Sequence, residues 1–207
     1  MGSVTVIRHP LIQAKLTKLR DKRTDRLLFR QILEELTAFL VYEITRDFPL
    51  REVEVETPLE RTKGGELAKP VVLVAIMRAG IVMTDGVLRL IPNARVGHIG
   101  IWRDPESLKP NLYYRKLPKN LPQALTIVVD PMLATGGSAA LAVRLVKEAG
   151  ARDIRFLCLV AAPEGIEAFR KEHPDVPIYT AAVDRELNDH GYILPGLGDA
   201  GDRLFGT

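Results

Sequence analysis

The 207-residue sequence contains a single cysteine, Cys158, so no disulfide can form within the chain. It has no uninterrupted apolar run near the roughly 18 residues that cross a bilayer, and its N-terminus shows no apolar signal-peptide core. Charge of one sign is also scarce, because 29 lysines and arginines against 26 acidic residues leave a net charge of +3. These absences exclude a disulfide scaffold, predict a cytoplasmic protein without a membrane span, and do not favour nucleic acid as a partner.

The composition that remains is typical of a folded domain. Hydrophobic residues make up 46% of the chain and charged residues 27%, which excludes a disordered protein. At this length we expect one domain with appendages and a sizeable core.

The hydrophobic pattern predicts an α/β protein with a helical N-terminal extension over residues 1–66. Leu11–Leu19 and a segment from about residue 26 to 46 have helical spacing, with Thr24 as the expected N-cap of the second helix. This helical pair is larger than a cap on a sheet needs, so we expect it to serve subunit contacts. Arg51–Thr57 alternates as a strand exposed on one side, and residues 61–66 read as a loop.

Residues 67–187 predict the α/β core. Buried strands are expected at residues 71–76, 96–102, 125–129, 154–160 and 178–182, with helices at 81–91, 138–149 and 163–171 between them. Strands that alternate with helices over short connections predict a parallel sheet with right-handed crossovers.

Two segments fall outside this alternation. Residues 103–121 are polar, aromatic and proline-containing, and they predict a mobile flap or extended arm. Residues 188–207 are rich in glycine, and such a tail would be floppy unless it packs against something, so we expect it to form a hood over a site.

The sharpest motif runs from Asp130 to Ser138, where a buried strand turns into a helix. Unsatisfied N–H groups and the positive end of the helix dipole suit a phosphate there, Gly136 and Gly137 permit close approach, and Thr135 and Ser138 add hydroxyls. A carboxylate repels phosphate, so Asp130 should serve sugar hydroxyls or a cation. The simpler alternative is a tight strand-to-helix turn with Ser138 as an ordinary N-cap.

The sequence resembles the uracil phosphoribosyltransferases. Residues 130–138, Asp-Pro-Met-Leu-Ala-Thr-Gly-Gly-Ser, resemble that family's loop for 5-phosphoribosyl 1-diphosphate (PRPP), and Gly191–Asp202 resembles its uracil loop. Pro131 stands where most phosphoribosyltransferases carry a second acid, a departure that the uracil branch shares. The resemblance implies a phosphoribosyltransferase fold and the transfer of phosphoribosyl from PRPP to uracil, giving UMP and diphosphate.

The resemblance also implies roles for individual residues. Asp130 and Arg78 are the expected catalytic residues, Arg78 and Arg103 are expected to bind the diphosphate, and Mg²⁺ is expected to be held through PRPP and water rather than by direct protein ligands. The implied PRPP-binding residues are Arg78, Arg103, Asp130, Pro131, Met132, Leu133, Ala134, Thr135, Gly136, Gly137, Ser138 and Asp199. The implied uracil-binding residues are Ile193, Gly198, Asp199 and Ala200.

Three further expectations stay open at this point. The resemblance implies a homodimer or larger homo-oligomer, and GTP is a candidate effector because some members of the family respond to it. A nucleotide-sensing regulator that binds RNA on the same fold is the alternative function. The single Gly-rich tail and the two arginines could also be structural, as a packed tail and as solvated surface charges.

Overall fold

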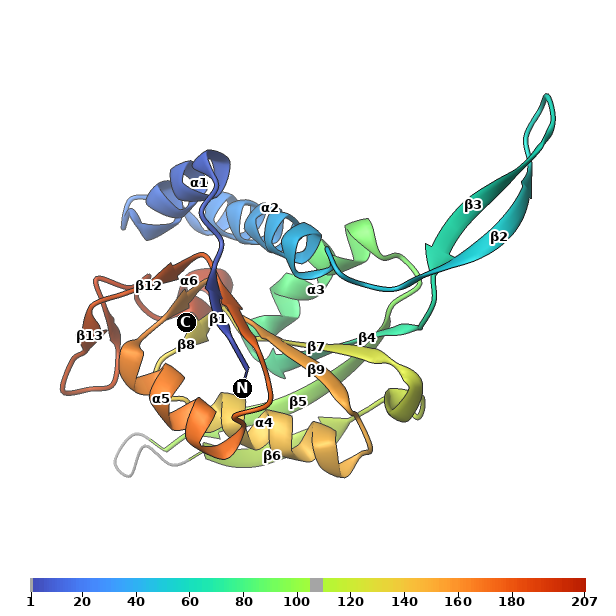
Figure 1. The fold of residues 1–207 in the computed structure, drawn as a ribbon. Helices are drawn as coiled ribbons and strands as arrows, with labels where there is room; N and C mark the ends of the chain where they lie inside the picture. Colours follow the sequence, from blue (N-terminus) through green and yellow to red (C-terminus); the bar gives the residue numbers. More distant parts are fainter. Residues whose placement is uncertain (1, 105–109) are drawn as a thin grey trace.

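The computed structural model describes residues 2–104 and 110–207, and a seven-stranded sheet forms its centre (Figure 1). Neighbouring strands are parallel except at one edge, where β5 and β6 are antiparallel. Continuous β-branched runs supply the middle strands, which are covered on both faces. In spatial order the strands are β1 (Val4–Val6), β11 (Ile178–Thr180), β9 (Asp153–Leu157), β7 (Leu125–Val129), β4 (Val71–Met77), β5 (Arg95–Arg103) and β6 (Pro110–Lys116).

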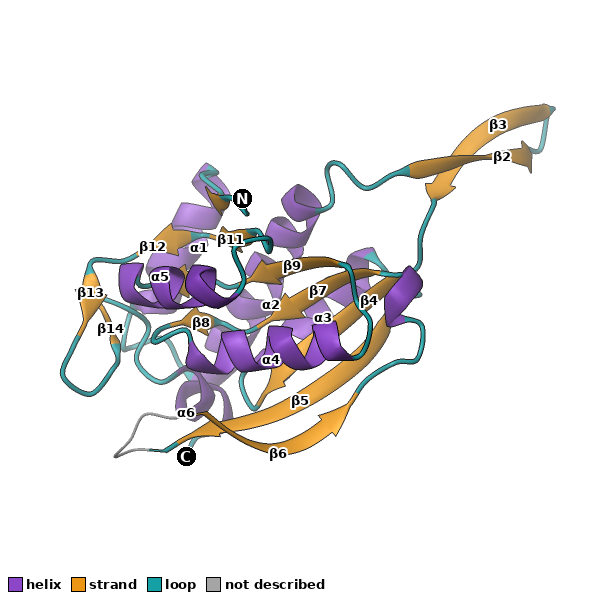
Figure 2. Cartoon of the chain, turned by 60° about the horizontal axis from the view of Figure 1, so that its bottom comes forward, coloured by secondary structure: helices purple, strands orange, loops and turns teal. Residues whose placement is uncertain are grey.

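Helices cover both faces of this sheet. Because successive side chains of a strand point to opposite faces, Leu73 and Ala75 join one hydrophobic core while Val72 and Val74 join the other. The first core also contains residues of α1 (Pro10–Arg20), α2 (Arg26–Ile44), α3 (Gly80–Leu90) and α6 (Ala200–Phe205). The second lies under α4 (Gly137–Glu148) and α5 (Pro163–Glu172), the face toward the reader in Figure 2.

Short strands and turns extend the sheet beyond the carboxyl ends of its strands. A small parallel sheet contains β8 (Met132–Leu133), β10 (Val160–Ala161) and β12 (Ala182–Val183), and an antiparallel pair joins β13 (Glu186–Leu187) to β14 (Ile193–Leu194). A 3₁₀ turn, η1 (Leu121–Gln123), precedes β7. The predicted parallel α/β core is therefore confirmed, and its carboxyl edge carries the loops that form the site.

The predicted loop at residues 61–66 is wrong. These residues form β3 (Arg61–Leu67), which pairs along its whole length with β2 (Leu50–Glu56). The resulting hairpin projects from the body, so β2 is exposed on both sides rather than on one (Figure 1). Glycines and charged residues conceal β3 in the sequence, because its residues, unlike those of β2, do not alternate between apolar and polar.

One smaller expectation is corrected, and two others stay predictions. The N-cap of α2 is Asp25, whose Oδ1 accepts the Leu28 N–H at 2.9 Å, and not Thr24. The predicted arm at 103–121 contains the edge strand β6, whereas its residues 105–109 lie outside the described residues. The helices α1 and α2 bury their apolar sides in the first core and so form a layer of the domain, while the expectation that they also serve subunit contacts stays a prediction.

Candidate active site

A cleft lies at the carboxyl ends of β4 and β7, where open α/β sheets place their ligands. It consists of two adjoining cavities of about 180 and 510 Å³. Both cavities are lined by Ala79, Asp130, Ser138, Tyr192, Asp199 and Gly201, so we treat them as one cleft. Residues from the core and from the tail therefore meet in one place.

The loop after β7 lines the smaller cavity and ends at the start of α4. Gly136 is the N-cap of α4 with a left-handed φ of 83°, and a Cβ there would lie 2.7 Å from the carbonyl oxygen of Gly165. No side chain caps the helix, so the alternative in which Ser138 is an ordinary N-cap is wrong. The exposed backbone donors of this first turn are therefore left to another partner.

Gly137 differs from its neighbour in an informative way. A Cβ added at Gly137 would make only ordinary contacts with the protein, the nearest at 3.4 Å from Cδ of Pro110. The packing of the chain therefore requires glycine at 136 but not at 137.

Asp130 follows β7 directly and is partly buried at the centre of the cleft. Burial raises the pKa of Asp130 to about 7, and the negative charge of Asp199 contributes in the same direction. The backbone N–H of Met132 donates to Oδ1 at 3.4 Å, which opposes the rise. This carboxyl group is therefore poised to change its protonation near neutral pH.

Arg78 emerges from the end of β4 into the larger cavity, after a cis peptide bond with Met77. Its side chain is half exposed and reaches α6, where Nη2 lies 3.4 Å from Oδ1 of Asp202. Nη1 donates to Oγ1 of Thr207 at 3.4 Å, and the guanidinium lies 5.9 Å from the ring centre of Phe205. These long contacts between exposed groups are weak, which suits an arginine that takes an anionic ligand.

The glycine-rich tail forms the opposite wall of the cleft. Gly198, Asp199 and Ala200 line the smaller cavity. Asp199 is the N-cap of α6, and its Oδ1 accepts the Asp202 N–H at 3.0 Å, so the carboxylate has a fixed position. The tail therefore packs against the domain and lines the cleft, and its role as a hood over a bound base stays a prediction.

The structure brings most predicted site residues to the cleft. Its walls include Arg78, Asp130, Met132, Leu133, Ala134, Thr135, Gly136, Ser138, Gly198, Asp199 and Ala200. Pro131, Gly137 and Ile193 line neither cavity, and the Ile193 side chain is buried in the first core. Arg103 ends β5, while its side chain falls outside the described part of the chain.

Sequence reasoning missed Tyr192, which lines both cavities, and the residues that hold the hood against α1. Tyr192 lies within Gly191–Asp202, the segment that resembles the uracil loop, so this motif was the sequence signal that could have identified it. Arg20, Asp184 and Arg203 had none, because ion pairs and carbonyl contacts between distant segments leave no local pattern.

Comparison with known proteins gives this arrangement its family. The sequence profile of the family "Uracil phosphoribosyltransferase" matches residues 6–207. The chain belongs to the uracil phosphoribosyltransferase family. A protein named uracil phosphoribosyltransferase from Geobacillus sp. (strain WCH70) is 60% identical over 208 residues, with all of both chains covered. Another of that name from Dictyoglomus thermophilum is 59% identical over 205 residues, which cover 99% of each chain.

A solved structure agrees with the uracil phosphoribosyltransferase fold. The AQ2163 protein from Aquifex aeolicus superposes with a TM-score of 0.94 at 39% identity, over 98% of this chain and 97% of the other. The mainly parallel central sheet confirms the predicted α/β fold class, and the AQ2163 protein shares this architecture. Among the described residues, no helix is long and apolar enough to cross a membrane.

Proposed function

We propose that the chain transfers the phosphoribosyl group of PRPP to uracil and produces UMP and diphosphate. The observation that carries this proposal is the shared cleft, in which the loop after β7 faces the glycine-rich hood. One wall offers backbone donors at a helix start for a phosphate, and the other offers closely spaced backbone groups for a flat base. Membership of the uracil phosphoribosyltransferase family supports the same reaction.

In this reaction the C1′–oxygen bond to diphosphate breaks and a bond from C1′ to N1 of uracil forms. Diphosphate leaves with the bonding electrons, and uracil releases its N1 proton to solvent, so the products are UMP, diphosphate and a proton. Arg78 and Arg103 bind the diphosphate and offset its charge as it departs. Asp130, below the ribose, holds its hydroxyls and favours the positive charge that develops on the sugar.

The phosphate of PRPP lies on residues 131–138. The first-turn N–H groups of α4 have no side-chain cap and can donate to the phosphate. The hydroxyl groups of Thr135 and Ser138, which line the same cavity, are further donors. Fixed donors of this kind lower the barrier mainly by positioning the substrate.

Uracil is read by the backbone at Ile193, Gly198 and Ala200. Its alternating carbonyl acceptors and N–H donors can pair edge-on with main-chain groups. Cytosine replaces one acceptor with an amine, which would leave a backbone N–H of the pocket without its acceptor, so the pocket discriminates against it.

Mg²⁺ is the expected cofactor. It prefers oxygen ligands and commonly combines substrate phosphates and water with one or two carboxylates. Asp130 and Asp199 line the same cleft and would hold the ion through water, which fits that pattern. When bound, the ion neutralises charge on the diphosphate.

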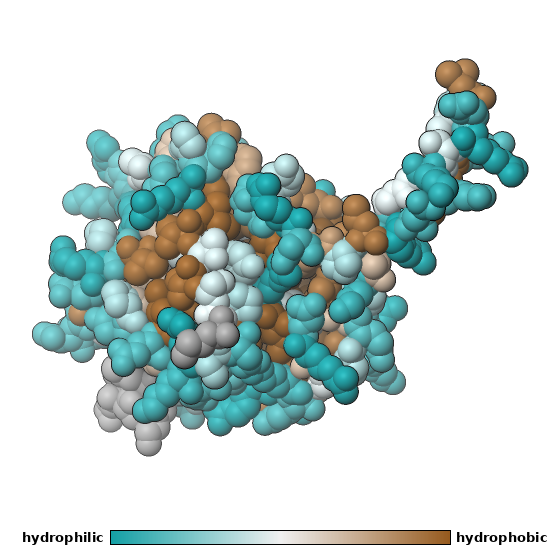
Figure 3. Space-filling view, in the orientation of Figure 1, coloured by the Kyte–Doolittle hydropathy of each residue, from teal (hydrophilic) through white to brown (hydrophobic). Residues whose placement is uncertain are grey.

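We also propose a cytoplasmic homodimer or larger homo-oligomer. The β2–β3 hairpin supports this, because an isolated two-stranded ribbon is marginally stable in water. The turn between the two strands contains Leu59, which is 96% exposed, and Figure 3 shows hydrophobic colour at the tip of the hairpin. Sedimentation at several protein concentrations tests the assembly; a monomer at micromolar concentration would contradict it.

The reaction is tested by measuring diphosphate release with PRPP, Mg²⁺ and each of uracil, cytosine, hypoxanthine, orotate and xanthine. Of these five bases, we expect only uracil to be turned over. A lack of turnover with uracil would refute the proposal. Binding of RNA with a steep salt dependence and no turnover would favour the regulator instead. Repeating the assay with GTP tests the proposal that GTP is an effector.

A further inference from the structure

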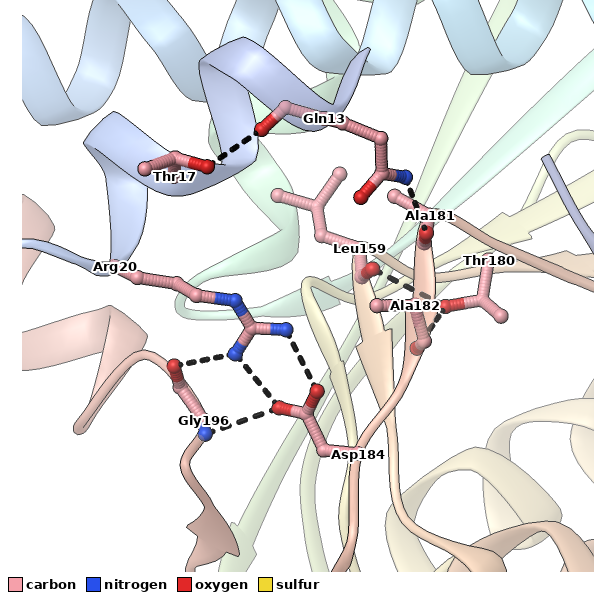
Figure 4. Close-up of polar contacts among 9 residues, drawn as sticks. All are labelled: Gln13, Thr17, Arg20, Leu159, Thr180, Ala181, Ala182, Asp184 and Gly196. Atoms are coloured by element: carbon pink, nitrogen blue, oxygen red, sulfur yellow. Dashed lines mark hydrogen bonds and ion pairs between the residues drawn. The ribbon is translucent and has the colours of Figure 1, made fainter. Parts of the chain in front are cut away.

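The N-terminal helix α1 contacts the hood through one arginine. Arg20, the last residue of α1, donates from Nη2 to Oδ1 of Asp184 at 2.6 Å and from Nη1 to Oδ2 at 2.7 Å (Figure 4). The same Nη1 donates to the carbonyl oxygen of Gly196 at 2.8 Å. Oδ2 of Asp184 accepts the Gly196 N–H at 3.0 Å. Arg20 and Asp184 together therefore satisfy both backbone groups of Gly196.

Gly196 is the point at which this contact can control the hood. It has a left-handed φ of 61°, and a Cβ there would overlap the carbonyl oxygen of Ile193, so the turn has one tightly defined shape. Gly198, Asp199 and Ala200 follow within a few residues and line the cleft. A shift at Gly196 would therefore move the wall that faces the substrate.

The ion pair is shielded enough to hold this geometry. The Asp184 side chain is 5% exposed and that of Arg20 is 24% exposed. A two-pronged arginine–carboxylate contact fixes orientation as well as distance. A buried carboxylate that lost its partner would be strongly unfavourable, so the pair closes whenever the hood is in place.

A second arginine, in the hood, contacts the backbone at the end of α1. Arg203 of α6 donates to the carbonyl oxygens of Leu19 at 2.7 Å and Asp21 at 2.8 Å, and to that of Leu197 at 2.9 Å. Its guanidinium lies 4.1 Å from the ring centre of Phe29 in α2. The hood is thus fixed to the end of α1 on both sides of the cleft-lining residues.

We propose that Arg20 is a positioning residue for the base: through Asp184 and Gly196 it holds the hood in the shape that binds uracil. Neither Arg20 nor Asp184 lines the cleft, so neither touches substrate. The proposal rests on the function given above and adds a task for α1, which prearranges the base site while the core binds PRPP. Prearranged groups spare a ligand the cost of ordering them.

The test compares Arg20→Gln, Arg20→Lys and Asp184→Asn with the wild type in steady-state assays. We expect KM for uracil to rise about tenfold or more in Arg20→Gln, which corresponds to about 1.4 kcal/mol, while KM for PRPP changes less than about threefold. Arg20→Lys keeps the charge but lacks the planar guanidinium, so its KM for uracil should lie between those of the wild type and Arg20→Gln. Arg20→Gln/Asp184→Asn should be no worse than the poorer single variant, because both act through one contact.

The matched control is Arg23→Gln, which removes an 84% exposed arginine that pairs with Asp21 just beyond the same helix. It should leave both KM values unchanged. Equal rises of KM for uracil and for PRPP, or no change in either, would overturn the proposal. If Arg20→Gln does not fold, the split between the two KM values in Arg20→Lys decides. Wild type without uracil turnover would refute the proposed function instead, before any variant is compared.

Discussion

Substituting Gly137 separates what the fold needs from what the ligand needs. An added methyl group at Gly137 would meet Pro110 at 3.4 and 3.5 Å, which are ordinary van der Waals distances. Alanine also restricts the unfolded chain, so Gly137→Ala should stabilise the protein by about 0.4–1 kcal/mol. For a domain of this size that corresponds to a rise in Tm of about 1–4 °C.

In the phosphate site that we propose on residues 131–138, the same methyl group would stand beside the first-turn N–H groups of α4 that bind the phosphate. We expect Gly137→Ala to weaken PRPP binding by at least about tenfold, or 1.4 kcal/mol, and the branched Gly137→Val to weaken it further. Isothermal titration with PRPP and Mg²⁺ gives the affinity, and thermal unfolding without ligand gives the stability.

Gly136→Ala is the matched control at the adjacent position. Its left-handed φ alone costs about 1–2 kcal/mol for a residue with a Cβ, and the carbonyl oxygen of Gly165 at 2.7 Å would have to move. The two substitutions should therefore shift Tm in opposite directions. A stable Gly137→Val protein with unchanged affinity for PRPP would refute the phosphate site.

Three other predictions concern separate parts of the molecule. Arg78→Ala should lower kcat by about 100-fold, the size expected for one transition-state donor, and should change stability by less than about 0.5 kcal/mol, because the side chain is half exposed; stopped assays and thermal melts measure both. Burial raises the pKa of Asp130 from its usual value of 3.8 to about 7. Between these two pH values the folded chain keeps a proton on Asp130 that the unfolded chain has released. The free energy of unfolding should therefore fall as pH rises, with a slope of up to about 1.4 kcal/mol per pH unit. Denaturant unfolding from pH 4 to 8 should show that slope in the wild type and a shallower one in Asp130→Asn. Equal slopes of the free energy of unfolding against pH in the two proteins would contradict a raised pKa for Asp130. Leu59→Ser should weaken self-association without changing the fold, since the side chain is 96% exposed. If sedimentation shows an unchanged assembly, the hairpin tip is not part of the subunit interface.

The sequence was most informative where burial and local chemistry coincide. Residues 71–76 and 125–129 are continuous apolar runs, and both are central strands. The motif at 130–138 was found because a turn into a helix needs particular residues over a short span. These are properties of neighbouring residues, which a single sequence displays directly.

What could not be predicted depends on residues that are far apart. The strand at Arg61–Leu67 exists because it pairs with β2, and its polar sequence has no period of its own. Asp25 and Thr24 are both good N-caps, and only the direction in which the chain enters α2 decides between them. The contact of Arg20 with Asp184 joins residues 164 positions apart, so no window of sequence contains it.

The pairing of β1 with β11 has a consequence for biosynthesis. Val4 pairs with Ile178, so β1 has no partner in the sheet until the chain has been synthesised through β11. Contacts between such distant segments form slowly, and the unpaired strand edge is open to intermolecular association meanwhile. A nascent chain that stops short of β11 therefore lacks both the sheet edge and the hood, and we expect it to have no complete active site.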